Sequence, residues 1–239
     1  MANHLKIATW NVNRPKQGGW KNNPTILTKI REVAADIWIL TETNCVISPG
    51  ESYQSIATQP DPSHSAGENC TTIWSHYPIK QTLATKDSQI AVCAEVDLGN
   101  SIDPLLVYGT IITWAHDGVL SKEATMWQRH YESIAWHSED WAKLSQDVPF
   151  CVAGDFNEAL SEPYCYGTQQ GRTLLNEALE RSNLVCVTAG SELGYNIDHI
   201  CLSADWAGRV MDVEKWQAFR EDGKPVSDHC GITVTLKLD

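Results

Sequence analysis

The sequence is poor in basic residues and has no long apolar run. Its 18 lysines and arginines stand against 30 aspartates and glutamates, which gives a net charge of −12. A basic surface is the usual mark of nucleic-acid binders, so tight, non-specific nucleic-acid binding is not expected. No apolar stretch approaches the roughly 20 residues that span a bilayer, so the sequence does not indicate a membrane protein.

Zinc-site spacings and an export signal are also absent from the sequence. None of the eight cysteines forms a C-x-x-C pair, and no cysteine–histidine spacing resembles a zinc site. The first residues, MANHLKIATWNVN, lack the basic and apolar regions of a signal peptide. We therefore expect a cytoplasmic protein whose cysteines are reduced and mostly pack as small buried hydrophobes.

What the sequence does contain is a series of short apolar strands with few helices between them. It opens as a strand at Leu5–Val12, a helix with Asn23 as N-cap and Pro24 in its first turn, and a strand at Asp36–Thr41. Further strands are expected at Thr71–Ser75, Ile90–Val96, Leu105–Ile112, Phe150–Ala153, Leu184–Thr188, Ile197–Leu202 and Ile232–Leu236, and helices at Lys122–Leu144 and Arg172–Ser182. Because strands outnumber helices, the pattern favours packed sheets covered by helices.

Five segments share one form, an apolar strand that ends in polar side chains. They are ATWNVN with Asn11 and Asn13, IWILTET with Glu42, FCVAGDFN with Asp155 and Asn157, NIDHI with Asp198, and SDHCGI with Asp228 and His229. Polar side chains at strand ends converge on one edge of a sheet, where α/β proteins commonly place their sites. Each segment alone occurs by chance, but the five together indicate a functional site.

The residue types in this set suit the hydrolysis of a phosphate ester with a divalent cation. Carboxylate oxygens are hard ligands that suit Mg²⁺, or Mn²⁺ as a substitute, rather than zinc. Such an ion polarises a phosphoryl group and lowers the pKa of a bound water. Asparagine orients water or phosphate without adding negative charge, and a histidine bonded to an aspartate stays protonated and stabilises the phosphate oxygens.

The stretches LKIATWNVN, ILTETN, TIWSHYPI, GDFN, IDHI and SDH resemble, in the same order, those of the endonuclease/exonuclease/phosphatase superfamily. That superfamily includes abasic-site DNA endonucleases, pancreatic deoxyribonuclease and inositol polyphosphate 5-phosphatases. The resemblance implies a four-layered α/β sandwich, in which two mainly antiparallel β-sheets pack face to face with helices outside. It extends over nearly the whole chain, so we expect one domain over residues 1–239.

The resemblance also implies which residues bind the metal ion. Glu42 resembles the principal ligand of the family's metal. Asn13 stands where many members have an aspartate or asparagine beside the metal, and Asp228 matches a position near the same ion.

Five more residues resemble the family's catalytic set. Asp155 resembles the residue that activates or positions the nucleophilic water. Asn11 and Asn157 resemble amides that orient phosphate and water. His229 resembles the histidine that contacts the phosphate, and Asp198 resembles its carboxylate partner.

One feature of the family is missing from the sequence. Members usually carry a histidine or tyrosine at the end of the strand before the long helix, and that position falls near Thr110, which cannot act as the acid. Tyr108 is expected on the other face of a regular strand. His116, in the next loop, is a candidate to contact substrate, as are Thr110, Arg172 for a phosphate and Trp114 for a base. For His116, Arg172 and Trp114, a surface or packing role is the alternative.

The leading hypothesis is therefore a monomeric, Mg²⁺-dependent hydrolase of phosphodiester bonds in DNA or RNA, with no membrane partner. The alternative is a phosphatase or phosphodiesterase that acts on a small-molecule or lipid head-group phosphate, which the acidic composition fits better. A third possibility is a binding module that keeps the fold without activity. Four clustered acids argue against it, because they repel one another unless a cation holds them.

Overall fold

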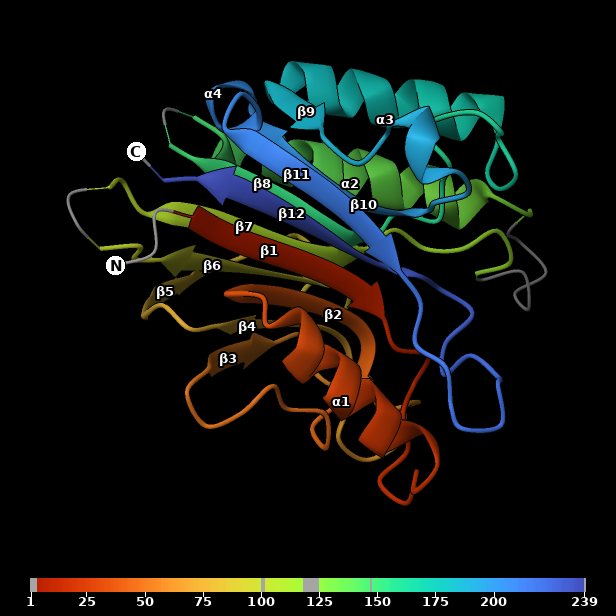
Figure 1. Ribbon diagram of the computed structural model, residues 1–239. Helices are drawn as coiled ribbons and strands as arrows, with labels where there is room; N and C mark the ends of the chain where they lie inside the picture. Colours follow the sequence, from red (N-terminus) through yellow and green to blue (C-terminus); the bar gives the residue numbers. More distant parts are fainter. Residues whose placement is uncertain (1–3, 100–101, 118–124, 147, 239) are drawn as a thin grey trace.

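The computed structural model describes residues 4–99, 102–117, 125–146 and 148–238. These residues form two six-stranded sheets, with the strand orders β11-β12-β1-β2-β4-β3 and β5-β6-β7-β8-β10-β9 (Figure 1). The strands are β1 His4–Asn11, β2 Ile37–Asn44, β3 Gln54–Ala57, β4 Glu68–Ser75, β5 Ile79–Leu83, β6 Ala91–Val96, β7 Leu105–Ile111, β8 Phe150–Asp155, β9 Leu184–Cys186, β10 Asp198–Ser203, β11 Val210–Trp216 and β12 Gly231–Lys237. Each sheet has one parallel pair, β1 with β2 and β7 with β8, and is otherwise antiparallel.

Helices cover the outer faces of both sheets. Figure 1 shows α1 (Asn22–Val33) on one side of the molecule, with α2 (Gln128–Leu144) and α3 (Gln169–Arg181) together on the opposite side. A short α4 (Ala204–Ala207) and a 3₁₀ turn at Ser191–Leu193 lie in the connections around β10. The arrangement confirms the predicted four-layered sandwich. Among the described residues, no helix is long and apolar enough to cross a membrane.

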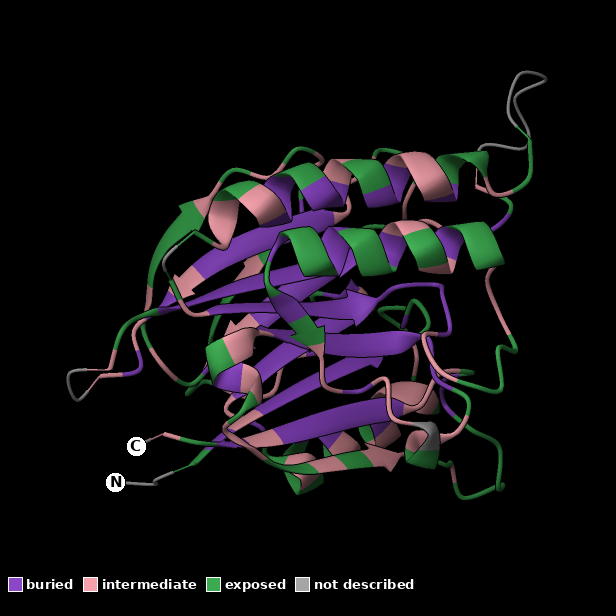
Figure 2. Ribbon diagram, turned by 90° about the horizontal axis from the view of Figure 1, so that it is seen from above, coloured by how far each residue is buried: buried purple, intermediate pink, exposed green. Residues whose placement is uncertain are grey.

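The alternation of side chains along the strands builds the layers. On β1, Leu5 and Ile7 are fully buried against the second sheet, whereas Ala8 and Trp10 pack with Ile26 of α1 on the outer face. Successive side chains of a strand point to opposite faces, so one apolar strand supplies both interfaces. Figure 2 shows this buried interior as purple strands beneath helices whose outer faces are exposed. The central strands are held on both faces and form a rigid base for the loops at their ends.

Strand direction brings distant parts of the chain to one edge of the sandwich. β10 runs antiparallel to β8, and Asp198 at its start lies opposite Asp155 at the end of β8. In the other sheet β12 runs antiparallel to β1, so the loop before β12 lies beside Asn11, the last residue of β1. The predicted site residues therefore come together because neighbouring strands begin where others end.

Two details of the predicted elements are wrong. The N-cap of α1 is Lys21 rather than Asn23, whose side-chain amide instead donates to the carbonyl of Lys16 at 2.9 Å. The long helix begins at Gln128, and residues 122–124 of its predicted start lie outside the described residues. Three strands were not predicted, namely β3, β5 and β11, whose side chains are mostly exposed or half-buried and so lack an apolar pattern.

Candidate active site

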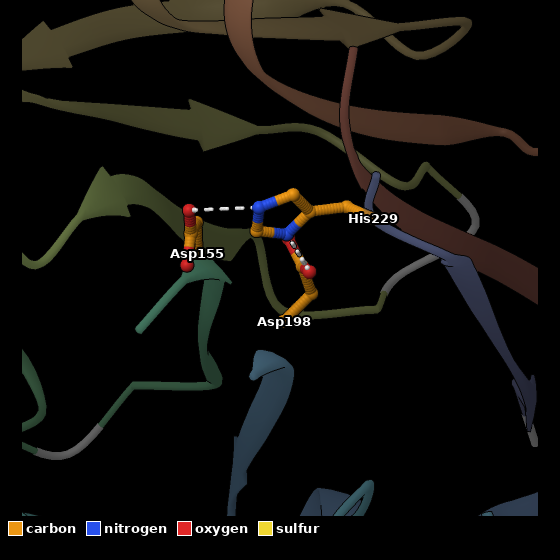
Figure 3. A group of neighbouring side chains, drawn as sticks. All are labelled: Asp155, Asp198 and His229. Carbon is orange, nitrogen blue, oxygen red and sulfur yellow. Dashed lines mark hydrogen bonds and ion pairs between the residues drawn. The ribbon is translucent and has the colours of Figure 1, made fainter. Parts of the chain in front are cut away.

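An aspartate, a second aspartate and a histidine form the centre of the site. His229 lies between the carboxylates of Asp155 and Asp198 (Figure 3). Its Nδ1 is 2.6 Å from Oδ2 of Asp198, and its Nε2 is 3.9 Å from Oδ2 of Asp155. The reactive atoms of the three side chains lie within 4.8 Å of one another. The structure thus brings together three predicted residues that the sequence separates by 74 positions, from residue 155 to residue 229.

The G-D-x-N segment has a conformation that its residue types explain. Gly154 has a φ of 142°, and a Cβ there would lie 1.9 Å from the carbonyl oxygen of Thr110 on β7, so only glycine fits. Asp155 Oδ1 accepts a hydrogen bond from the backbone N–H of Asn157 at 2.9 Å, which turns the chain immediately after the strand. Asn157 itself has a φ of 48°, a left-handed conformation that asparagine tolerates. This turn directs Asp155 and Asn157 to the same cleft.

Two asparagine amides fix the position of the central carboxylate. Asn11 Nδ2 donates to Asp155 Oδ2 at 3.0 Å, while Asn11 Oδ1 accepts from the backbone N–H of Asn13 at 2.9 Å. Asn157 Nδ2 donates to the carbonyl of Ile112 at 2.9 Å. The side-chain amide of Asn11 and the backbone N–H of Asn157 thus hold the buried Asp155 in one orientation, and the side chain of Asn157 fixes the turn to Ile112.

The pKa values of Asp155 and His229 are both raised, but for different physical reasons. Burial, and then repulsion from Asp198, raises the pKa of Asp155 to about 7, although His229 and two hydrogen bonds oppose the rise. Burial alone would lower the pKa of His229, but the charges of Asp198 and Asp155 raise it to about 10. At neutral pH His229 is therefore an imidazolium that donates Nδ1–H to Asp198. Asp155 is then a carboxyl group poised to gain or lose a proton.

Of the three residues predicted to bind metal, two line the cleft and the third contacts one of them. Glu42 and Asp228 line the same cleft as Asp155, and Asn13 Nδ2 donates to Asp228 Oδ1 at 3.1 Å. Asn13 and Glu42 have positive φ values of 55° and 45°; Asn13 lies just beyond the end of β1, whereas Glu42 is a local irregularity within β2. Oδ1 of Asp198 is buried and has no hydrogen-bond partner among the described residues. Carboxylate and amide oxygens such as those of Glu42, Asn13 and Asp228 fit a hard cation such as Mg²⁺ or Mn²⁺.

A cleft of about 680 Å³ opens at this edge of the sandwich. Its wall is acidic, with six carboxylates against two arginines and the His229 imidazolium: Glu42, Asp61, Asp87, Asp117, Asp155, Asp228, Arg14, Arg129 and His229. Both arginines are already paired, Arg14 with Glu42 at 3.2 Å and Arg129 with Glu132 at 3.3 Å. No lysine of the described residues lines the cleft.

Thr110 is not placed to contact substrate, so that prediction is wrong. Its side chain is fully buried, and its Oγ1 lies 3.1 Å from Nε2 of His137 on α2. Tyr108 faces the same way, not the opposite way as expected, with its hydroxyl 2.9 Å from Nδ1 of His137. The residue that β7 presents to the cleft is Ile111. Neighbouring strand residues face opposite sides, so an error of one position moved the expected side chain out of the site.

The two loop candidates after β7 have different positions. Trp114 lines the cleft and is 53% exposed. His116 is exposed and packs against Trp114, with ring centroids 5.1 Å apart, but it is not part of the cleft wall. Trp114 is therefore the better placed of the two to meet a bound molecule.

Arg172 is engaged elsewhere, which contradicts the prediction that it reaches a phosphate. Its Nη1 lies 3.0 Å from Oε1 of Glu158, and its guanidinium lies over the ring of Tyr164 at 4.3 Å from the centroid. It does not line the cleft. Its charge is used to balance a buried carboxylate.

Glu158 is a structural centre that the sequence argument missed, although it follows GDFN directly. It is fully buried and also contacts Nε2 of His130 at 3.2 Å and the backbone N–H of Thr168 at 3.3 Å. Its own carbonyl lies 3.0 Å from Nε2 of His199, the neighbour of Asp198. A Cβ on Gly167 would lie 1.7 Å from Oε1 of Glu158, so that glycine leaves room for the carboxylate. Glu158 thereby joins α2, α3 and β10 to the turn that carries Asp155 and Asn157.

Arg14, Tyr166 and Tyr195 also line the cleft and were not predicted. Arg14 follows the N-V-N segment directly, and Tyr195 precedes the N-I-D segment. For Arg14 and Tyr195, this position beside a motif is the sequence signal that could have found them, because sites form at strand ends.

The fold and the site define a class of phosphoesterases. The chain belongs to the endonuclease/exonuclease/phosphatase family, whose sequence profile matches residues 8–229. Among curated proteins, none matches the chain by sequence.

Two solved structures share the fold. An AP endonuclease from Archaeoglobus fulgidus superposes with a TM-score of 0.72 at 18% identity, covering 97% of this chain and 99% of its own. The AP endonuclease LMAP from Leishmania major has a TM-score of 0.72 at 16% identity, covering 98% of this chain and 88% of its own. Both similarities extend over nearly the whole chain.

Proposed function

We propose that this protein is a metal-dependent hydrolase of phosphodiester bonds in nucleic acid. The observation that carries the proposal is the buried Asp155–Asp198–His229 cluster, which opens into an acidic cleft. Family membership and the two AP endonuclease structures support a nuclease. We further propose one domain over residues 1–239, acting as a monomer in the cytoplasm.

His229 and Asp198 would neutralise the phosphate. Nε2–H of the imidazolium faces the cleft, while Nδ1–H is held by Asp198 at 2.6 Å. The raised pKa of His229 keeps this donor charged throughout the neutral range. A charge-assisted hydrogen bond from Nε2 to a phosphate oxygen strengthens as charge develops there, so it lowers the barrier to hydrolysis.

Asp155 would accept the proton of the attacking water. A pKa of about 7 is close to the optimum for a general base at neutral pH. Asn11 and the N–H of Asn157 fix the orientation of this carboxylate. The attacking water must therefore lie within hydrogen-bond distance of Asp155, on the side of the phosphorus opposite the leaving oxygen.

Glu42, Asn13 and Asp228 would hold the cation, because their oxygens line or border the same cleft. When bound, Mg²⁺ supplies Lewis-acid polarisation of the phosphoryl group and neutralises the leaving oxygen. Glu42 also contacts Arg14, so this arginine is positioned to balance Glu42 when no cation is bound.

Hydrolysis of a single-stranded oligonucleotide, an abasic-site duplex and a panel of phosphate monoesters tests the proposal. We expect cleavage of a nucleic acid with Mg²⁺ or Mn²⁺, and its loss with EDTA. His229→Ala and Asp155→Ala should lower the rate by at least about 100-fold. Asp97→Asn, at an exposed ion pair with Lys80, is the matched control and should be unchanged. Activity that survives EDTA or both site variants would refute the mechanism.

The second candidate is a phosphatase or phosphodiesterase for a small-molecule or lipid head-group phosphate. The observation in its favour is the acidic cleft wall, whose two arginines are paired with carboxylates. Release of phosphate from the small esters, without cleavage of any oligonucleotide, would select this candidate.

A further inference from the structure

Four aromatic side chains line the cleft and are not used by the proposed chemistry. Trp114 and Tyr195 are 53% and 45% exposed, and both line the cleft together with Tyr166 and Trp136. Aromatic rings gain free energy when they are removed from water. Large rings that stay exposed in a folded protein therefore often mark a binding surface, where a ligand covers them. Of the exposed rings in the described part of the chain, Trp114 and Tyr195 line this cleft.

Two of these rings, Tyr195 and Tyr166, lie near the reacting groups. Tyr195 is close enough to Asp198 and Asp155 that, after burial, their charges raise the pKa of its phenol to about 12. Burial, and with it the charge of Asp155, raises the pKa of the Tyr166 phenol, which lines the same cleft. A molecule whose phosphate meets His229 therefore has aromatic faces next to it.

The charges of the cleft are unsuited to a long polyanion. Duplex DNA is held through many phosphate contacts from lysine and arginine. The wall of this cleft has six carboxylates, and both of its arginines are paired. Base–aromatic stacking, by contrast, depends little on charge and is available to any base that is not paired.

We infer that the cleft takes a phosphodiester with an unpaired nucleobase next to the scissile bond, and that Trp114 is the residue on which this base stacks. The inference rests on the proposed function and narrows its substrate to single-stranded nucleic acid. Trp114 is exposed, lines the cleft and lies on the loop after β7, so its ring is available without rearrangement of the core. Trp114 would then determine specificity, while Asp155 and His229 act on the phosphate.

Matched substrates and variants test the inference. We would measure kcat/KM with Mg²⁺ on a short oligothymidine strand, a strand of equal length made of tetrahydrofuran abasic residues, and a duplex with one abasic site. The proteins are wild type, Trp114→Ala, Trp114→Phe and Trp20→Ala, a control at an exposed tryptophan that is not in the cleft wall. Anisotropy of the labelled strands in EDTA gives binding without turnover.

The oligothymidine strand should be the best substrate of the wild type. Trp114→Ala should lower its kcat/KM and its affinity by about 5- to 150-fold, as expected for the loss of one stacked base. The effect on the abasic strand should be small, Trp114→Phe should restore most of the loss, and Trp20→Ala should behave as wild type. Hydrolysis that is equal on all three substrates and indifferent to Trp114 overturns the inference alone. Absence of hydrolysis of every phosphodiester overturns the proposed function, and the inference with it.

Discussion

Replacing Asp155 by asparagine should make the metal-free protein more stable at alkaline pH while removing its activity. The pKa of Asp155 rises from an ordinary value of 3.8 to about 7 in the folded protein. A group whose pKa is higher in the folded than in the unfolded protein binds its proton more tightly in the folded state. The contribution of protonated Asp155 to the free energy of unfolding is therefore fully present below pH 3.8, and it is lost as the pH rises through 7.

The size of the effect follows from the same shift. At 1.36 kcal/mol per pKa unit, ionising Asp155 costs the folded state about 4 kcal/mol above pH 7. Asparagine removes this cost, but its amide cannot accept every hydrogen bond that Asp155 accepts from Asn11 and Asn157, which costs about 1–2 kcal/mol. We expect a net gain of roughly 2–3 kcal/mol, or about 4–12 °C in Tm for a chain of this size.

Urea unfolding of wild type and Asp155→Asn in EDTA, at about pH 8 and about pH 4, measures this difference. EDTA is needed because a bound cation would itself offset the repulsion between the carboxylates. The gain should be present at the higher pH and replaced by a small loss at the lower one, where Asp155 is protonated in the folded protein and only the missing hydrogen bonds still count. A variant that is no more stable than wild type at pH 8, or a gain that does not change with pH, would show that Asp155 is not destabilised by its surroundings.

Three further predictions concern the neighbours of this group. The pKa of His229 is raised from 6.5 to about 10, so the contribution of its charge to the free energy of unfolding is complete below pH 6.5 and is lost as the pH rises to 10. In a series of unfolding experiments at different pH, His229→Gln should reduce the change in unfolding free energy between pH 6.5 and 10 by a few kcal/mol. Glu158→Gln leaves Arg172 and a buried site without their counter-charge, so we expect a loss of about 3–5 kcal/mol in urea unfolding and a lower kcat with little change in KM; an unaltered kcat would argue against a positioning role. Thr110→Val should cost only about 1 kcal/mol and leave kcat/KM as in wild type, whereas a large loss of activity would return Thr110 to the site.

The sequence was informative where polar residues end apolar strands. Asn11, Glu42, Asp155, Asp198 and Asp228 were all placed at one edge by that rule, and the structure brings them there because antiparallel neighbours begin where other strands end. The rule needs only the position of each strand end, to within a residue or two.

The sequence could not show which face of a strand each side chain points to, nor which charged residues pair across long loops. Thr110 and Ile111 are adjacent, yet one faces α2 and the other the cleft, so an uncertainty of one residue in register decides between them. Glu158 and Arg172 are 14 residues apart and meet only after the loop between them has folded. Such pairs carry no periodic signal in the chain.

The pairing of β1 with β12 has a consequence for how the protein forms. The first and last strands lie side by side in the interior of one sheet, with Leu5 opposite Leu236. Contacts of such large sequence separation form late, because most of the chain must be ordered before they can close. During synthesis, a nascent chain that has not yet released β12 holds Asp155 and Asp198 but has no His229 beside them. A chain made only as far as β11 therefore lacks the assembled Asp155–Asp198–His229 cluster, because His229 lies directly before β12.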